Sequence, residues 1–236
     1  MNNTKELFSN EYLKIIEDKN ISGMFKIQFT YSNIQLINSL VRTKIINGAT
    51  ITDDYKSILF KSFSLKSFQQ FKKERIQIGF SDALNMVYSL SSQLNYLINA
   101  QQYTFLGYNP DYLFVINNTK FIYLDSENLK EINNNKILIS SPFYTNDFFV
   151  SPELLKIKTI PSYVHFKTSY FSLAFLVLYA LSNNTKQFYE SQLYKNYLHQ
   201  NDDFGKILSK YPNTKLQHLL SRCLVDDPTK RTILFI

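Results

Sequence analysis

The most specific stretch of the sequence is Leu220-Ser221-Arg222-Cys223-Leu224-Val225-Asp226-Asp227-Pro228-Thr229-Lys230-Arg231. It follows and overlaps a segment from Thr214 to Leu224 in which apolar residues recur at helical spacing, namely Leu216, Leu219, Leu220 and Cys223. We therefore expect a helix with one buried face, on which Cys223 is a small core residue. The helix ends before Pro228, because a proline disfavours helical backbone in the residue that precedes it.

Two further helices are expected upstream of this motif. Ser81 and Asp82 are candidate caps of a helix whose apolar residues form one stripe, namely Ala83, Val87, Leu90, Leu94 and Leu97. The second helix covers 168–182 and contains the longest apolar run of the chain, so we expect it to be buried.

The region between these helices predicts a hairpin and then a long loop. Tyr103 to Val115 and Thr119 to Leu124 are apolar runs separated by Asn117 and Asn118, which favour a turn. Residues 126–151 are polar and irregular, and a loop of that length is usually functional or mobile.

The N-terminal part predicts a small α+β unit of about sixty residues, at the low end of the usual domain size. Phe25 to Tyr31 alternates apolar and polar residues, as a half-buried strand does. Ile34 to Ile46 has helical spacing and ends at Asn47 and Gly48. Ala49 to Thr52 and Ser57 to Phe63 predict two more strands.

Composition excludes several classes of protein. The chain has 236 residues, of which 44% are hydrophobic and 19% charged, so it is not mainly disordered. One cysteine excludes an internal disulfide framework, and three scattered histidines suggest no metal site. We expect no secretory signal and no membrane span, and the single cysteine fits an intracellular, cytoplasmic protein. The abundance of Asn, Ile and Lys suggests an A/T-rich genome, such as that of a large DNA virus, in which case the protein is a candidate virion component.

The order of these elements, with the residues at their joints, resembles the eukaryotic-type protein kinase fold from about Ser57 onward. The stretch that ends in Arg231 is similar to the family's Asp-Pro segment, whose Arg pairs with the Glu of an Ala-Pro-Glu motif. Here Val150-Ser151-Pro152-Glu153-Leu154 supplies Glu153. The resemblance implies an α+β, two-lobed kinase-like fold with a reduced N-lobe (1–63), a mainly helical C-lobe (64–236) and a structural ion pair between Glu153 and Arg231.

Other segments of the chain extend the resemblance. Tyr108 to Val115 resembles the catalytic loop and the strand after it, and Phe121 to Asp125 resembles the strand that leads to Asp-Phe-Gly. Ser57 to Phe71 is similar to the last N-lobe strand, the hinge and a short helix. Ser169 to Ala174 is similar to the start of the central buried helix, with Ser169 in place of an Asp that braces the catalytic loop.

The same alignment removes most of the chemistry of phosphoryl transfer. The His-Arg-Asp positions hold Phe105, Leu106 and Gly107, so no acidic base remains. Asn109 replaces the catalytic-loop Lys and Tyr112 the metal-binding Asn.

The metal-binding and phosphate-binding parts are degenerate too. Asp-Phe-Gly reads Asp125, Ser126 and Glu127, which leaves Asp125 as the one candidate metal or cofactor ligand. No G-x-G-x-x-G can be written in the N-terminal part, and no Glu lies between Glu17 and Glu74 to partner Lys26. The resemblance therefore implies a pseudokinase without bound ATP or Mg²⁺.

Three functions follow as hypotheses. The first is an inactive kinase-like scaffold, regulator or assembly component that binds protein partners and is a candidate for an oligomer. The second is an atypical nucleotide-dependent transferase that uses Asp125. The third is a basic nucleic-acid-associated protein, suggested by the net charge of +7, although the densest basic group, Lys72, Lys73 and Arg75, favours an ordinary solvated helix face.

An aromatic group precedes Ser151 and consists of Phe143, Tyr144, Phe148 and Phe149. It is either an exposed surface that binds a partner or a group that packs into the vacant cleft that the resemblance implies between the two lobes. Apolar residues from Ile233 to Ile236 are a second candidate assembly surface.

Overall fold

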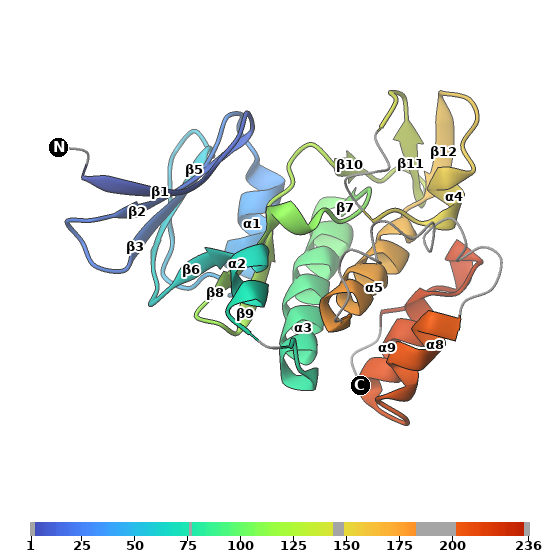
Figure 1. The fold of residues 1–236 in the computed structure, drawn as a ribbon. Helices are drawn as coiled ribbons and strands as arrows, with labels where there is room; N and C mark the ends of the chain where they lie inside the picture. The colour runs from blue at the N-terminus through green and yellow to red at the C-terminus, as the bar shows by residue number, and fades with distance from the viewer. Residues whose placement is uncertain (1–2, 76, 144–148, 183–201, 234–236) are drawn as a thin grey trace.

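Strands gather in the N-terminal part of the chain and helices in the C-terminal part, so the fold is mixed α+β (Figure 1). The computed structural model describes residues 3–75, 77–143, 149–182 and 202–233. An antiparallel sheet has the order β1-β2-β3-β5-β4. Its strands are β1 (Thr4–Ser9), β2 (Leu13–Asp18), β3 (Met24–Phe29), β4 (Thr50–Ile51) and β5 (Ser57–Lys61).

Helix α1 (Ile34–Arg42) lies beside this sheet and packs against the helical segment 80–101 (Figure 1). The buried side of β3 carries Phe25, Ile27 and Phe29, which belong to the same core as the buried residues of the helix. The helix starts at Asn33, whose side chain accepts a hydrogen bond from the amide of Leu36. It ends before the predicted Ile46, because Lys44 has a positive φ of 59° that helical backbone does not tolerate.

A three-stranded sheet of order β6-β8-β9 follows in the middle of the chain. Its strands are β6 (Leu65–Ser67), β8 (Leu113–Ile116) and β9 (Lys120–Tyr123). The predicted hairpin is confirmed in β8 and β9, where Asn117 and Asn118 have φ values of 53° and 61° and form the tight turn. Helix α2 (Phe68–Lys73) follows β6, and a short 3-10 turn, η2 (Pro110–Tyr112), precedes β8.

Helix α3 (Phe80–Tyr96) continues into a π-helical turn, η1 (Leu97–Gln101). The predicted cap at Ser81 or Asp82 is displaced: the cap residue is Gly79, whose amide donates to the Asp82 carboxylate over 3.3 Å. Gln93 on α3 is fully buried. Its side-chain amide donates a hydrogen bond to the backbone carbonyl of Tyr123 and accepts one from the backbone N–H of the same residue.

The expectation of an irregular loop over 126–151 is wrong, because two strands lie within it. Strand β10 (Leu129–Glu131) pairs with β7 (Tyr103–Phe105), and β11 (Lys136–Ile139) pairs with β12 (Ser162–His165). The strands with which β10 and β11 pair are distant in sequence. The polar composition of 126–151 therefore gave no local signal of either strand.

Buried helix α5 (Thr168–Leu181) lies at the centre of the helical part, as expected. Around it are α4 (Pro152–Leu155), α8 (Asp202–Ser209), α9 (Lys215–Cys223) and the 3-10 turn η3 (Pro228–Lys230). Cys223 is buried, as expected of a core residue. Among the helices that the structure describes, none has both the length and the apolar character needed to cross a bilayer.

Candidate functional site

The segment that resembles a catalytic loop follows β7 and has no acidic side chain at the position of the expected base. Phe105, Leu106 and Gly107 are all buried. Gly107 offers backbone atoms alone, and its carbonyl oxygen accepts a hydrogen bond of 3.3 Å from the hydroxyl of Tyr123. A backbone carbonyl is not a general base at neutral pH, so this position has no proton acceptor for a substrate hydroxyl.

Asn109 and Tyr112 have structural roles in and around η2. The Asn109 side chain accepts a hydrogen bond from the amide of Asp111 at 2.9 Å and thereby caps the turn. Burial, together with the nearby charges of Asp125 and Glu127, raises the pKa of Tyr112 to about 12. The phenol therefore stays protonated at neutral pH, which makes it a poor metal ligand.

Asp125 is fully buried and its oxygens are engaged inside the protein. Oδ2 accepts hydrogen bonds from the Tyr123 hydroxyl at 3.0 Å and from Nδ2 of Asn128 at 2.7 Å, and Oδ1 accepts from the Asn128 amide at 3.2 Å. Burial raises the pKa of the Asp125 carboxyl, although these hydrogen bonds oppose the shift. The side chain fastens the turn after β9 and does not point into open solvent.

Ser126 and Glu127 occupy the next two positions, and neither restores the missing chemistry. Ser126 is half-buried, while Glu127 is exposed. The backbone carbonyl of Glu127 accepts a hydrogen bond of 2.9 Å from Nζ of Lys130. Its carboxylate is close to the hydroxyl of Tyr12, and this proximity raises the pKa of Tyr12 to about 12.

Tyr12 belongs to a contact zone between the N-terminal sheet and the middle of the chain, here called the junction and made of Phe8, Asn10, Tyr12, Tyr112, Phe114 and Glu127. Nδ2 of Asn10 donates to the Tyr112 hydroxyl over 2.9 Å. The ring of Phe8 lies edge-on to those of Tyr112 and Phe114, at centroid distances of 6.1 and 5.2 Å. The turn between β1 and β2 is thereby held against η2 and β8.

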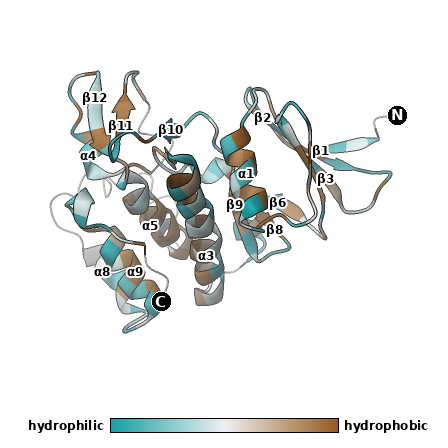
Figure 2. Ribbon diagram, turned by 180° about the vertical axis from the view of Figure 1, so that it is seen from behind, coloured by the Kyte–Doolittle hydropathy of each residue, from teal (hydrophilic) through white to brown (hydrophobic). Residues whose placement is uncertain are grey.

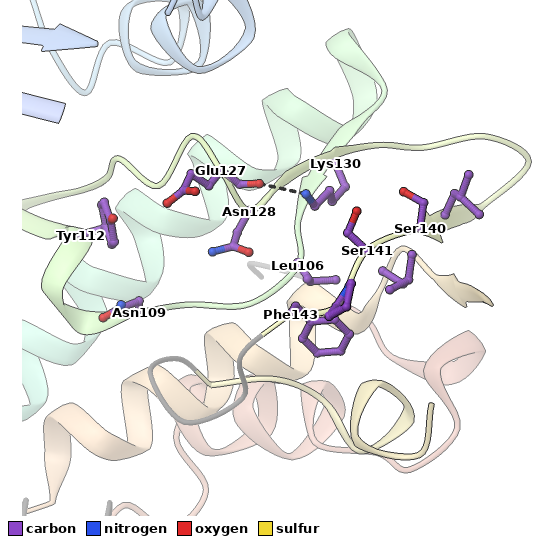
Figure 3. Close-up of a pocket in the computed structure, with 12 residues that line it drawn as sticks. Leu106, Asn109, Tyr112, Glu127, Asn128, Lys130, Ser140, Ser141 and Phe143 are labelled. Atoms are coloured by element: carbon purple, nitrogen blue, oxygen red, sulfur yellow. Dashed lines mark hydrogen bonds between the residues drawn. The ribbon is translucent and has the colours of Figure 1, made fainter. Parts of the chain in front are cut away.

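A cavity of about 420 Å³ lies beside the junction (Figure 3). Asn109, Tyr112, Glu127 and Asn128 line one side of it, and the segment after β11 lines the other through Ser140, Ser141 and Phe143. Its lining is mixed: hydroxyl and amide groups, one carboxylate and one ammonium group lie beside apolar side chains, which include Leu106 and Leu138. The volume is sufficient for a small ligand, but no group of three or more His, Cys, Asp or Glu among the described residues offers a metal site.

Helix α1 offers Lys26 no carboxylate, because its sequence from Ile34 to Arg42 has no Asp or Glu. Along β3 the residues alternate, so Lys26 lies on the face opposite to the buried Phe25 and Ile27. On the helix the buried polar side chain is Ser39, whose hydroxyl donates to the carbonyl of Leu36. The lysine and carboxylate pair that phosphate binding needs is therefore not formed between these elements.

Glu153 and Arg231 lie together, although 78 residues separate them in sequence. Arg231 donates from both terminal nitrogens to the two carboxylate oxygens of Glu153, over 2.6 and 2.9 Å. The Arg231 side chain is fully buried; its Nε donates to the carbonyl of Val225 at 2.7 Å, and its guanidinium lies over the ring of Phe171. This bidentate pair joins α4 to η3 and α5, which is a structural role.

Ser169 retains a link between α5 and the loop segment. Its hydroxyl accepts a hydrogen bond of 2.8 Å from the Thr104 hydroxyl on β7 and donates to the carbonyl of Phe166. A neutral hydroxyl pair therefore connects the buried helix to β7, in the region for which the resemblance expects an aspartate.

The aromatic group before Ser151 is not an exposed surface at the positions that the structure describes. Phe149 is buried against Phe175 and Tyr179 of α5, with ring centroids 5.3 Å apart in both pairs, so the exposed alternative is wrong for this residue. Phe143 is half-buried, packs on the core and lines the cavity. Tyr144, Phe148 and the tail beyond Ile233 lie outside the described residues.

The densest basic group is partly used inside the protein. Nζ of Lys72 donates to the carbonyls of Tyr179 and Ser182, and burial lowers the pKa of Lys72 to about 8. Arg75 pairs with Asp82 at 3.3 Å. Lys73 is exposed. One fully free cation of the three does not make a basic surface for phosphates.

The contacts of Phe8, Asn10 and Tyr12 are absent from the sequence prediction. Phe8 lies in β1, and Asn10 and Tyr12 lie in or next to the polar turn that follows it. Nothing local indicates that these residues meet others about 100 positions away. The chain matches no protein-family model and no curated protein.

Proposed function

We propose that the chain is a catalytically inactive protein kinase-like protein, a pseudokinase that works by binding other proteins as a scaffold, regulator or assembly component. Under this proposal residues 1–63 correspond to a reduced N-lobe and residues 64–236 to a helical C-lobe. The proposal combines the sequence resemblance with the geometry described above.

The arrangement of the N-terminal part supports the kinase-like assignment. The helix α1 follows the third strand of an antiparallel sheet, which is where a kinase carries the helix that positions its phosphate-binding lysine. The ion pair of Arg231 with Glu153 supports it independently, because the resemblance expects these two residues to be partners.

One observation carries the inactive assignment: the place of the catalytic base is Gly107, whose carbonyl already accepts a hydrogen bond from Tyr123. Phosphoryl transfer to a hydroxyl needs a positioned carboxylate there. The junction adds to this, because Phe8 and Asn10 occupy the space between the sheet and η2.

The two alternative functions are less well supported. A transferase that used Asp125 as a metal ligand would have to break its bonds to Tyr123 and Asn128. A nucleic-acid function would need a basic surface, whereas Lys72 and Arg75 have protein partners.

The test is a thermal-shift titration of the full chain with ATP, with and without Mg²⁺ or Mn²⁺, beside a transfer assay with labelled ATP. A ligand at 100 times its Kd adds about 2.7 kcal/mol to the free energy of unfolding. We expect no shift at millimolar ATP and no transferred phosphate, with an active kinase as the positive control. Phosphate transfer would contradict the proposal, as would a metal-dependent shift that Asp125→Asn removes while the variant still folds.

A further inference from the structure

The paired strands β11 and β12 form a ribbon that projects from the helical part beside α4 (Figure 1). Its two faces differ because side chains alternate along each strand. Ile137 and Ile139 on β11 and Val164 on β12 are buried against the protein. Within the residues that the structure describes, the ribbon has these two strands alone, and the backbone of Lys136 also bonds that of Asn133.

The opposite face, here called the ribbon face, consists of Lys136, Leu138, Tyr163 and His165. Leu138 lies directly opposite Tyr163, and Lys136 lies opposite His165. Leu138 is 45% exposed and Tyr163 is 66% exposed, which leaves an apolar pair in solvent at the centre of the face. Figure 2 shows the apolar character of β11 on this projecting part of the molecule.

Exposed apolar side chains are concentrated around this ribbon. Nine large apolar or aromatic side chains are exposed among the described residues, and three of them, Leu138, Ile160 and Tyr163, lie on the ribbon or in the two residues before β12. An exposed aromatic beside an aliphatic residue, on a ribbon of two strands, is a typical docking surface for an extended segment.

The charges around the ribbon are mainly positive, although Glu131 on the neighbouring strand β10 and Asp227 near His165 carry negative charge. Lys136 is exposed on the ribbon face itself, and Lys156 and Lys158 are exposed on the segment that leads to β12. Among the described residues from 132 to 167, Glu153 is the one acidic side chain, and it is neutralised by Arg231. The surface therefore attracts carboxylates and repels basic segments.

We propose that the ribbon face binds an acidic, extended segment of a partner protein whose apolar side chains cover Leu138 and Tyr163 and whose carboxylates face the lysines. The inference rests on the proposed function as a protein-binding module and names the surface and the chemistry of the partner. The apolar pair supplies the buried centre of such an interface, and the lysines supply its charged rim.

The test uses the full chain as bait for a phage-displayed library of random 16-residue peptides. Binding of synthetic copies of the enriched peptides is then measured by fluorescence anisotropy at low and high salt. The variants are Leu138→Asp with Tyr163→Asp for the apolar pair, and Lys136→Glu with Lys158→Glu for the charges. Phe63→Asp is the matched control, because Phe63 is 99% exposed on the segment between β5 and β6. Circular dichroism and the melting temperature check the fold of each variant.

We expect enriched peptides that combine Asp or Glu with apolar residues and bind less tightly at high salt. Each double variant should weaken binding by about tenfold or more, and Phe63→Asp should leave it unchanged. Peptides without acidic residues, equal binding to the folded double variants, or no enrichment at all would overturn the inference. A dimer would also overturn the inference if light scattering detects it for the native chain and not for the Leu138→Asp, Tyr163→Asp variant. A second copy of the chain would then be the occupant of the ribbon face. The inactive assignment has a separate readout in the ATP assays, so the two proposals fail independently.

Discussion

The side-chain amide of Asn10 donates a hydrogen bond of 2.9 Å to the hydroxyl of Tyr112, 102 residues further along the chain. This contact fixes the turn between β1 and β2 on η2. Under the proposed kinase-like fold, that turn is the part that would cover the phosphates of a nucleotide. Asn10 of the turn and Phe8 of β1 both contact Tyr112, so under that proposal the chain's own side chains occupy this space.

The strength of this contact is measurable by a double-mutant cycle. Asn10→Ala also removes the caps that Asn10 provides to the amides of Tyr12 and Leu13, so the single variant overstates the contact. A cycle made of Asn10→Ala, Tyr112→Phe and the double variant should give a coupling energy of about 0.5 to 1 kcal/mol, measured by urea unfolding. The matched cycle of Asn10→Ala with Tyr55→Phe, on an exposed tyrosine outside the junction, should be additive. An additive result for Asn10 and Tyr112 would mean that the turn is not held by this bond.

The buried pair of Arg231 and Glu153 should dominate the stability of the C-terminal part. Arg231→Met leaves the carboxylate of Glu153 without its bidentate partner and removes the bonds to Val225 and Asp226. We expect a loss of about 3 to 5 kcal/mol in the free energy of unfolding. Lys230→Met is the control, because the exposed pair of Lys230 with Asp227 at 3.8 Å is worth under about 1 kcal/mol. Similar losses for the two variants would refute a structural role of the pair.

Lys72 should make stability depend on pH in the alkaline range. Burial lowers the pKa of Lys72 to about 8 in the folded chain, from an ordinary value of 10.5. Between these two values the unfolded chain binds more protons than the folded one, so stability rises with pH. The free energy of unfolding of the native chain should therefore rise relative to that of Lys72→Met from pH 7.5 to 10.5.

Urea unfolding at several pH values measures this difference. Lys73→Met, at the exposed neighbouring position, is the control for a general effect of losing one charge. A difference between the native chain and Lys72→Met that stays constant over this range would show that the two carbonyl contacts of Lys72 compensate fully for its burial.

Two glycines with positive φ offer a matched test of backbone packing. A Cβ on Gly23 would lie 2.6 Å from the carbonyl oxygen of Ser62, whereas one on Gly48 would meet nothing within 4 Å. Both residues have left-handed backbone, with φ of 72° and 61°. Gly48→Ala should lower the free energy of unfolding by about 1 to 2 kcal/mol, because of the backbone conformation alone. Gly23→Ala should lower it by about 1 to 3 kcal/mol more, because its Cβ also clashes. Equal unfolding midpoints for the two variants would contradict this account.

Local patterns predicted the elements whose signals are complete within a few residues. The hairpin of β8 and β9 is an example, since Asn117 and Asn118 favour left-handed backbone and the flanking runs are apolar. The edge strand β1 was missed because it buries almost no side chain, so its sequence lacks a buried face to recognise. Strand β11 was missed because its partner β12 begins more than twenty residues later.

In the candidate site, too, some features can be predicted from the sequence and others depend on tertiary packing. The absence of a carboxylate at Gly107 is a fact of the sequence, and the structure adds that its carbonyl is engaged by Tyr123. The burial of Asp125 and the meeting of Asn10 with Tyr112 depend on tertiary packing. No pattern of spacing contains that information, because each contact joins segments whose approach is determined by the rest of the core.

The buried amide of Gln93 has a consequence for motion. It bonds the backbone of Tyr123 as a neighbouring peptide group would, over 2.9 and 3.1 Å, and it also donates to the Ser39 hydroxyl at 3.3 Å. Sliding of α1 past α3 would break a hydrogen bond in a region without solvent to replace it. We therefore expect α1, α3 and β9 to move as one rigid body, so that a bound partner would tilt this unit as a whole instead of swinging the helix by itself.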